Sequence, residues 1–114
     1  MAIRIEHVGD VAVVIVEGML TGDPETDQFQ STLDGLIQGG QKKVLLNLEG
    51  TTFITSRAFG VIIVSHNAAK KHKATLYTCG MQERVMKVIK IIRVTGWPKQ
   101  FDSCKEALAA LQEL

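Results

Sequence analysis

Adjacent hydroxyl side chains at the start of a predicted helix are the groups of this chain best placed to do chemistry. Thr55 and Ser56 stand immediately before Arg57, at the point where a strand pattern changes to a helical one. A serine nucleophile needs a base within hydrogen-bond reach, but His66 lies further along the same predicted helix, about 15 Å away at 1.5 Å per residue. The sequence therefore predicts no catalytic residues, and helix capping explains the two hydroxyls first.

The imidazoles and the glycines offer no cofactor site. His7, His66 and His72 are the only histidines, and none has a second ligand at a spacing that would bring metal ligands together. The glycines match neither a GxGxxG turn nor a GxxxxGK[ST] loop. We expect solvated histidines, no metal, no cofactor and no nucleotide hydrolysis.

The cysteines indicate the cellular compartment, and the charge balance indicates which partners the chain can attract. Cys79 and Cys104 have no paired spacing, so we expect single buried thiols with a structural role. The first residues lack the apolar stretch of a signal peptide, and no apolar run is long enough to span a bilayer. With 13 Lys and Arg against 12 Asp and Glu, the net charge is +1, which gives no global attraction for nucleic acid or an anionic membrane. The sequence predicts a cytoplasmic protein without nucleic-acid binding or membrane insertion.

Alternating strand and helix patterns predict the elements that position Ser56. Strands are expected near residues 3–5, 11–16, 43–48, 74–78 and 100–101, and helices over 24–38, 56–72, 82–93 and from 103 onward. Because helices that follow strands require parallel crossovers, this order favours a mixed sheet. We predict one α/β domain over residues 1–114, with a four- or five-stranded mixed sheet and about four helices, mostly packed against it.

Capping residues mark the helix boundaries. Asp23 is expected to cap the first helix with Pro24 at its first helical position, and Gly39 with the following glycine should end it. Either Thr55 or Ser56 can cap the second helix. Ser103 begins a capping box, with Glu106 three residues later.

Three segments of the sequence resemble a STAS domain, the fold of the bacterial anti-sigma factor antagonists, and the likeness covers essentially the whole chain. In that family a phenylalanine and an apolar residue are followed by Asp-Ser-Ser-Gly-Leu-Gly, and Ser56 matches the serine that a partner kinase phosphorylates. The matching segments are 13–20 (VVIVEGML), 44–60 (VLLNLEGTTFITSRAFG) and 80–97 (GMQERVMKVIKIIRVTGW); after Phe53 and Ile54 this chain has Thr55-Ser56-Arg57-Ala58-Phe59-Gly60.

The resemblance implies a protein ligand rather than an enzyme. A family member binds an anti-sigma factor that is also a serine kinase and so frees the sigma factor, and phosphorylation ends the binding. The implied phosphorylation site is Ser56, with Thr55 as a second acceptor. The implied partner-binding residues are Thr21, Thr55, Ser56, Arg57, Ala58 and Phe59.

Departures from the family motif leave other functions open. Thr55 replaces the motif aspartate, Arg57 replaces its second serine, Ala58 its first glycine, and Thr21 stands where an acidic residue is usual. A STAS scaffold or accessory subunit without a switch, in a stress-signalling complex or a lipid transporter, is the alternative. Arg57 could instead pair with a phosphate or an acidic partner, and further copies of the chain or homologous STAS proteins are candidate partners. A hydrolase using Ser56 would lack a base.

Overall fold

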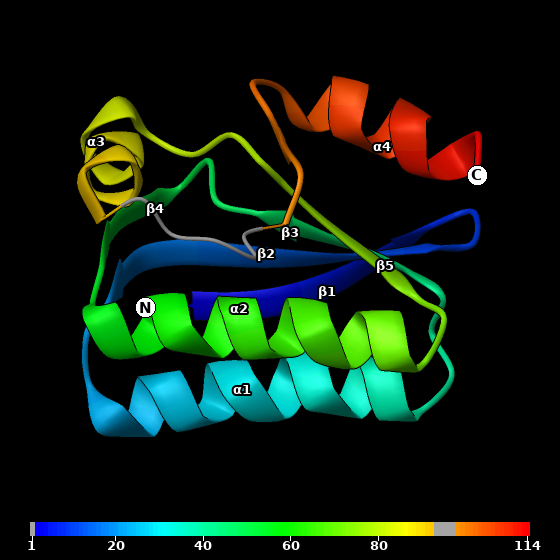
Figure 1. The fold of residues 1–114 in the computed structure, drawn as a ribbon, viewed down its shortest axis with the longest axis horizontal. Coiled ribbons are helices and arrows are strands. Elements are labelled where there is room, and N and C mark those ends of the chain that lie inside the picture. Colours follow the sequence, from blue (N-terminus) through cyan, green and yellow to red (C-terminus); the bar gives the residue numbers. More distant parts are fainter. Residues whose placement is uncertain (1, 93–97) are drawn as a thin grey trace.

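A mixed sheet forms the middle layer of the computed structural model, which describes residues 2–92 and 98–114, with side chains described for 2–87 and 98–114 (Figure 1). The strand order is β1-β2-β3-β5-β6, and β4 pairs with the end of β2. Only the β1 and β2 pair is antiparallel among the described strands. The strands are β1 Ala2–Val8, β2 Val11–Leu20, β3 Lys43–Asn47, β4 Thr51–Ile54, β5 Thr75–Cys79 and β6 Gln100–Phe101.

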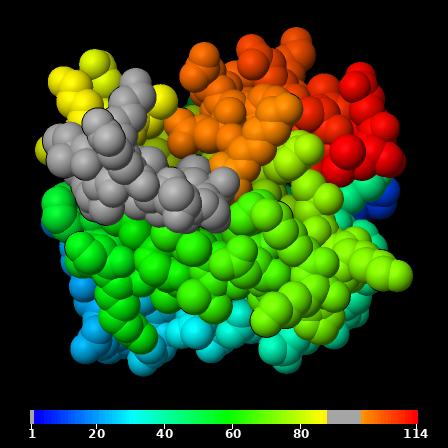
Figure 2. Space-filling model, viewed as in Figure 1, coloured from blue at the N-terminus to red at the C-terminus, as the bar shows by residue number. Residues whose placement is uncertain are grey.

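Helices cover both faces of this sheet. Helices α1 and α2 lie side by side on one face, α4 lies on the opposite face, and α3 stands next to β4 (Figure 1). In the space-filling view α2, in green, crosses the visible face between α1 and α4 (Figure 2). Their bounds are α1 Asp23–Gln38, α2 Ser56–Lys71, α3 Glu83–Ile92 and α4 Cys104–Gln112.

The central strand β2 divides the interior into two cores. Every residue of the run 11–16 is buried, because a strand covered on both faces has no solvent-facing side. Val14 and Val16 belong to the larger core, which α1 and α2 close with Phe29, Leu33 and Ile62 among others. The alternate residues Val11, Val13 and Ile15 face a smaller core that Ala107 and Leu111 of α4 close.

The predicted fold class is confirmed, with one more strand than expected. The hairpin turn has Gly9 at φ +60°, residues 100–101 are extended, and Ser103 Oγ accepts a hydrogen bond from the Glu106 amide at 3.2 Å. The sixth strand is β4, which lies outside the strand ranges that we predicted. Helix α2 ends one residue before the expected position 72, and the predicted helix end at 93 lies outside the described residues.

The start of α1 differs from the prediction. Gly22, in an extended conformation, is the N-cap residue, and Asp23 is the first helical residue with no side-chain cap. The cap moves because Asp23 points its carboxylate at Arg57 of α2 instead, at 3.2 Å. Thr26 Oγ1 donates to the Gly22 carbonyl at 2.8 Å.

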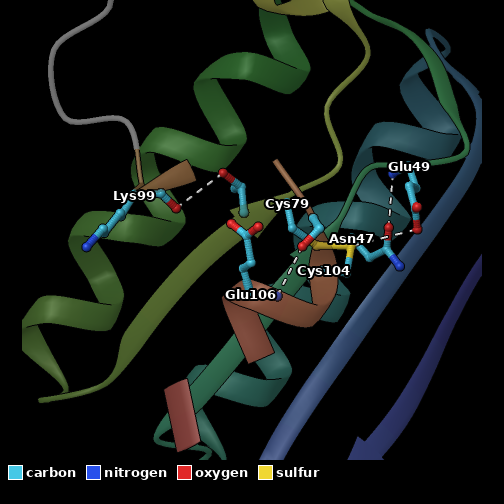
Figure 3. The surroundings of a disulfide bond; sticks show 8 residues. Asn47, Glu49, Cys79, Lys99, Cys104 and Glu106 are labelled. Carbon is cyan, nitrogen blue, oxygen red and sulfur yellow. Dashed lines mark hydrogen bonds between the residues drawn. A yellow bond between two sulfur atoms is a disulfide. The ribbon is translucent and has the colours of Figure 1, made fainter. Parts of the chain in front are cut away.

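The two cysteines form a disulfide, so the prediction of single thiols is wrong. Cys79 ends β5 and Cys104 begins α4, and the pairing of these elements brings their Cα atoms to 5.0 Å (Figure 3). Glu49, in the turn after β3, lies beside this bond with Oε2 3.8 Å from Cys104 Sγ. The disulfide removes the cysteine argument for a reducing compartment.

The histidines also depart from the prediction at one position. His7 and His72 are exposed as expected, but His66 is half-buried. Its Nδ1 is buried without a hydrogen-bond partner in the described part of the chain. None of the described helices combines the length and apolar character that a membrane crossing requires.

Candidate functional site

The end of β2 and the start of α2 meet at one corner of the sheet. β2 and β4 are parallel with Leu20 opposite Ile54, and the Thr55 amide donates to the Leu20 carbonyl at 3.2 Å. Thr21 therefore leaves β2 beside the residue that begins the turn into α2. The carboxyl ends of neighbouring parallel strands are where open α/β sheets place their binding sites.

Thr55 and Ser56 have different roles at this corner. Thr55 is extended at φ −77° and ψ 164°, and its Oγ1 accepts a hydrogen bond from the Ala58 amide at 3.3 Å. Ser56 is the first helical residue and is exposed, and its hydroxyl makes no hydrogen bond to the described residues. The cap is therefore Thr55, and the fold does not use the Ser56 hydroxyl.

Arg57 ties α2 to α1. Its guanidinium donates to Asp23 Oδ1 at 3.2 Å and to Asp27 Oδ1. The hydrogen bond to Asp27, followed by the charges of Asp27 and Asp23, raises the pKa of Arg57, so the group is fully protonated. Arg57 is therefore paired with two carboxylates of its own chain, although its side chain remains 44% exposed.

The six predicted partner-binding residues divide by exposure. Thr21, Ser56 and Arg57 are exposed and Thr55 is half-buried. Ala58 and Phe59 are buried and pack into the larger core, because the first turn of α2 directs these two side chains at the sheet. A partner can therefore touch only part of the motif, because Ala58 and Phe59 do not lie on the surface.

Two exposed apolar residues beside the site were not predicted. Met19 is 54% exposed and Phe53 is 46% exposed. They are opposite each other in the β2 and β4 pairing, so they share a face of the sheet end. Sequence reasoning missed them because an apolar residue in a short strand reads as buried, although Phe53 belongs to the motif segment.

A shallow pocket of about 40 Å³ lies between β4 and α3. Arg84 of α3 closes one side by donating to the Thr52 carbonyl at 2.9 Å. The pocket is mainly apolar, and it adjoins the segment that carries Ser56. Its lining residues are Thr52, Phe53, Ile54, Phe59, Arg84 and Val85.

The chemistry at this corner suits binding. No residue that the structure describes belongs to a group of three His, Cys, Asp or Glu side chains able to hold a metal ion. The fixed charges are the Asp23 and Asp27 carboxylates and the Arg57 guanidinium between them. Exposed hydroxyls, two apolar side chains and a small acidic cluster are the kinds of group that protein interfaces use.

Comparison with known proteins places this geometry in a family. No curated protein gave a significant sequence match. An anti-sigma factor antagonist from Mycobacterium paratuberculosis has the same fold, with a TM-score of 0.84 and 13% identity over 97% of this chain and 93% of that one. The anti-sigma factor antagonist SpoIIAA in its unphosphorylated form gives 0.79 and 18% over 99% and 100%. The phosphorylated form of Bacillus SpoIIAA, a cell fate determinant, gives 0.74 and 17% over 96% and 98%.

The low sequence identities to these structures establish only a shared fold, so the family assignment rests on a match to the sequence itself. The family model of the STAS domain matches residues 2–107. That match covers nearly all of the 114 residues, including both strands and both helices that build the Ser56 corner. The chain therefore belongs to the STAS domain family.

Proposed function

We propose that this chain is a regulatory binding module of the anti-sigma factor antagonist kind, without enzymatic activity of its own. Residues 1–114 act as one domain in the cytoplasm and bind a serine-kinase-type anti-sigma factor through the corner around Ser56. Phosphorylation of Ser56 by that partner ends the binding. SpoIIAA, which has the same fold, occurs in an unphosphorylated and a phosphorylated form, and this supports the proposal.

The observation that carries this proposal is that Thr55 and Ser56 have different roles in the fold. Thr55 supplies the helix cap, so a kinase that modifies Ser56 removes no hydrogen bond from the fold. The exposed Ser56 hydroxyl is accessible to a kinase, whereas Thr55 is half-buried and engaged. We therefore assign Ser56, rather than Thr55, as the acceptor.

The binding surface combines the motif with the apolar pair next to it. Met19 and Phe53 supply exposed apolar area, and Thr21 and Ser56 supply hydroxyls that can hydrogen-bond across an interface. An aromatic side chain beside a shallow pocket is the usual centre of a protein interface. Phe53 is the residue of this surface that we expect to contribute most to affinity.

Phosphorylation would reverse binding through charge and bulk. A phosphate adds about −1.5 to −2 charges, beside a cluster in which two carboxylates already outnumber one guanidinium. The positive end of the α2 dipole tolerates that charge, so the fold survives. A partner surface packed over Ser56 would face both a steric clash and a buried negative group.

The test measures labelling and affinity together. The purified chain is incubated with the serine-kinase-type anti-sigma factor from the same genome, ATP and magnesium, and the phosphate is located by mass spectrometry. We expect one phosphate on Ser56, none after Ser56→Ala, and at least about 30-fold weaker binding after Ser56→Glu. Ser31→Glu, which adds the same charge at an exposed position of α1, is the matched control and should bind like the natural chain.

Two outcomes would overturn the switch. One is no label on Ser56 or Thr55; the other is equal affinity for Ser56→Glu and Ser31→Glu. Loss of the motif aspartate, replaced by the capping Thr55, favours the scaffold alternative in that case. Affinity capture that yields a transporter subunit or an assembly of homologous STAS proteins would then identify the scaffold role.

A further inference from the structure

The edge strand β1 presents an unusually open pairing edge. It is seven residues long and, among the strands that the structure describes, pairs only with β2; six of its residues are exposed, with Ile3 half-buried. Proteins usually protect such an edge with proline, lysine, a bulge or a short strand. β1 has no proline, lysine or bulge, and its charged residues are one of each sign, Arg4 and Glu6, whereas β6 at the opposite edge is two residues long.

The sequence of β1 is complementary to itself when it runs antiparallel. In a pair of identical strands related by a two-fold axis, the residue at the axis faces its own copy and residues on either side face each other. With the axis at Ile5, Arg4 lies opposite Glu6 of the partner subunit and Glu6 lies opposite Arg4 of the partner subunit. Ala2 and Val8 then face each other at both ends, so the whole strand is paired.

Other registers lose this complementarity. An axis at Arg4 or at Glu6 sets a charged residue directly opposite its own copy, and like charges in that position destabilise a strand pair. Either shift also leaves the ends of the strand unpaired. The pattern therefore selects the register centred on Ile5.

The exposed side chains of β1 fit this arrangement. Ile5 is 41% exposed on the face of α1 and α2, and its own copy at the axis would cover it. Arg4 and Glu6 lie on the other face with side chains 58% exposed and 3.6 Å apart, and Arg4 also pairs with Glu17 of β2. α4 packs on β2, β3, β5 and β6, so these two charged residues have room for a partner.

We propose that β1 is a self-association edge, through which two copies of this chain join their sheets with Ile5 on the two-fold axis. Alternating Arg4 and Glu6 side chains from the two copies form a four-membered charge cluster on one face. About six to eight backbone hydrogen bonds link the strands. Because a single strand pair buries less than a standard interface, the dissociation constant lies in the micromolar range, about 10–100 µM.

The test uses charge reversal in pairs. Arg4→Glu alone and Glu6→Arg alone each place like charges opposite each other twice, so each variant should weaken dimerisation at least about tenfold in sedimentation equilibrium. An equimolar mixture of these two variants restores opposite charges at every position and should form a heterodimer. Lys105→Glu, at an exposed position of α4, is the matched control and should dimerise like the natural chain.

Each result decides the proposal. Circular dichroism first establishes that both variants are folded, and the heterodimer in the mixture shows that neither is merely damaged. A natural chain that stays monomeric at about 1 mM, well above the expected dissociation constant, would overturn the proposal. So would dimers that are unchanged in both single variants, because association would then use another surface.

Discussion

Reduction of the Cys79 and Cys104 disulfide should lower stability more than any other mild change to this chain. The bond closes a loop between residues 25 positions apart, and the chain-entropy relation assigns about 3.5 kcal/mol to a loop of that length. For a domain of this size that corresponds to a fall in Tm of about 10–15 °C.

The structure indicates where the loss should appear first. α4 covers the smaller core with only Ala107 and Leu111 fully buried, and burial of one leucine side chain contributes about 1.5–3 kcal/mol. Without the covalent link, α4 is held by the burial of Ala107 and Leu111 and by the Ser103 cap at its start. We therefore expect local opening of α4 at a lower free energy than global unfolding.

Thermal denaturation with and without a phosphine reductant measures the effect on a single sequence. Hydrogen exchange should show faster exchange in α4 than in β2 or β3 after reduction. A Cys79→Ser/Cys104→Ser double variant is the control, and its Tm should not respond to reductant. An unchanged Tm, with both thiols shown to be reduced by mass spectrometry, would refute the idea that this bond constrains the chain.

Two further predictions concern the buried face of α2. Burial, followed by the charge of Lys70, lowers the pKa of His66; the unfolded chain therefore binds a proton more readily near pH 6.5, and stability should fall as pH drops from 7 to 5. In urea titrations, His66→Gln should make the free energy of unfolding depend less on pH between 7 and 5, and an equal dependence in both proteins would contradict the assignment. A hydrogen bond from Lys43 lowers the pKa of Asp10 from 3.8, so Asp10 titrates below this pH range and does not interfere. Ser65 Oγ is buried with no hydrogen-bond partner among the described residues, so Ser65→Ala should raise the unfolding free energy by about 1 kcal/mol. A loss of similar size would show that the hydroxyl is satisfied.

Local sequence signals predicted the elements that depend on neighbouring residues. The β-branched run 11–16 reads as a strand buried on both faces, and it is the buried centre of the sheet. Ser103 with Glu106 predicted the start of α4, and Gly39 predicted the end of α1. Each of these features depends on a few consecutive side chains, so the sequence contains the whole signal.

The features that were missed depend on distant pairings. β4 is a strand only because Thr51, Phe53 and Ile54 meet the end of β2 across a register shift between Gly18 and Met19. The disulfide exists because β5 and α4 pack together, which cysteine spacing does not reveal. The N-cap at Gly22 also depends on a distant contact, because Asp23 pairs with Arg57 of α2.

The altered motif can be understood as one linked change in charge. Replacing the family's Asp-Ser-Ser by Thr55-Ser56-Arg57 removes one negative charge and adds one positive charge. Asp23 and Asp27 of α1 lie against Arg57, so this three-residue cluster carries one net negative charge. Thr55 meanwhile keeps the capping role through its hydroxyl. This chain thus keeps the helix start, and the carboxylates nearest Arg57 come from α1. Under the proposed function, we predict that the kinase contacts these α1 carboxylates, so Asp27→Asn should impair labelling of Ser56 without removing the acceptor itself.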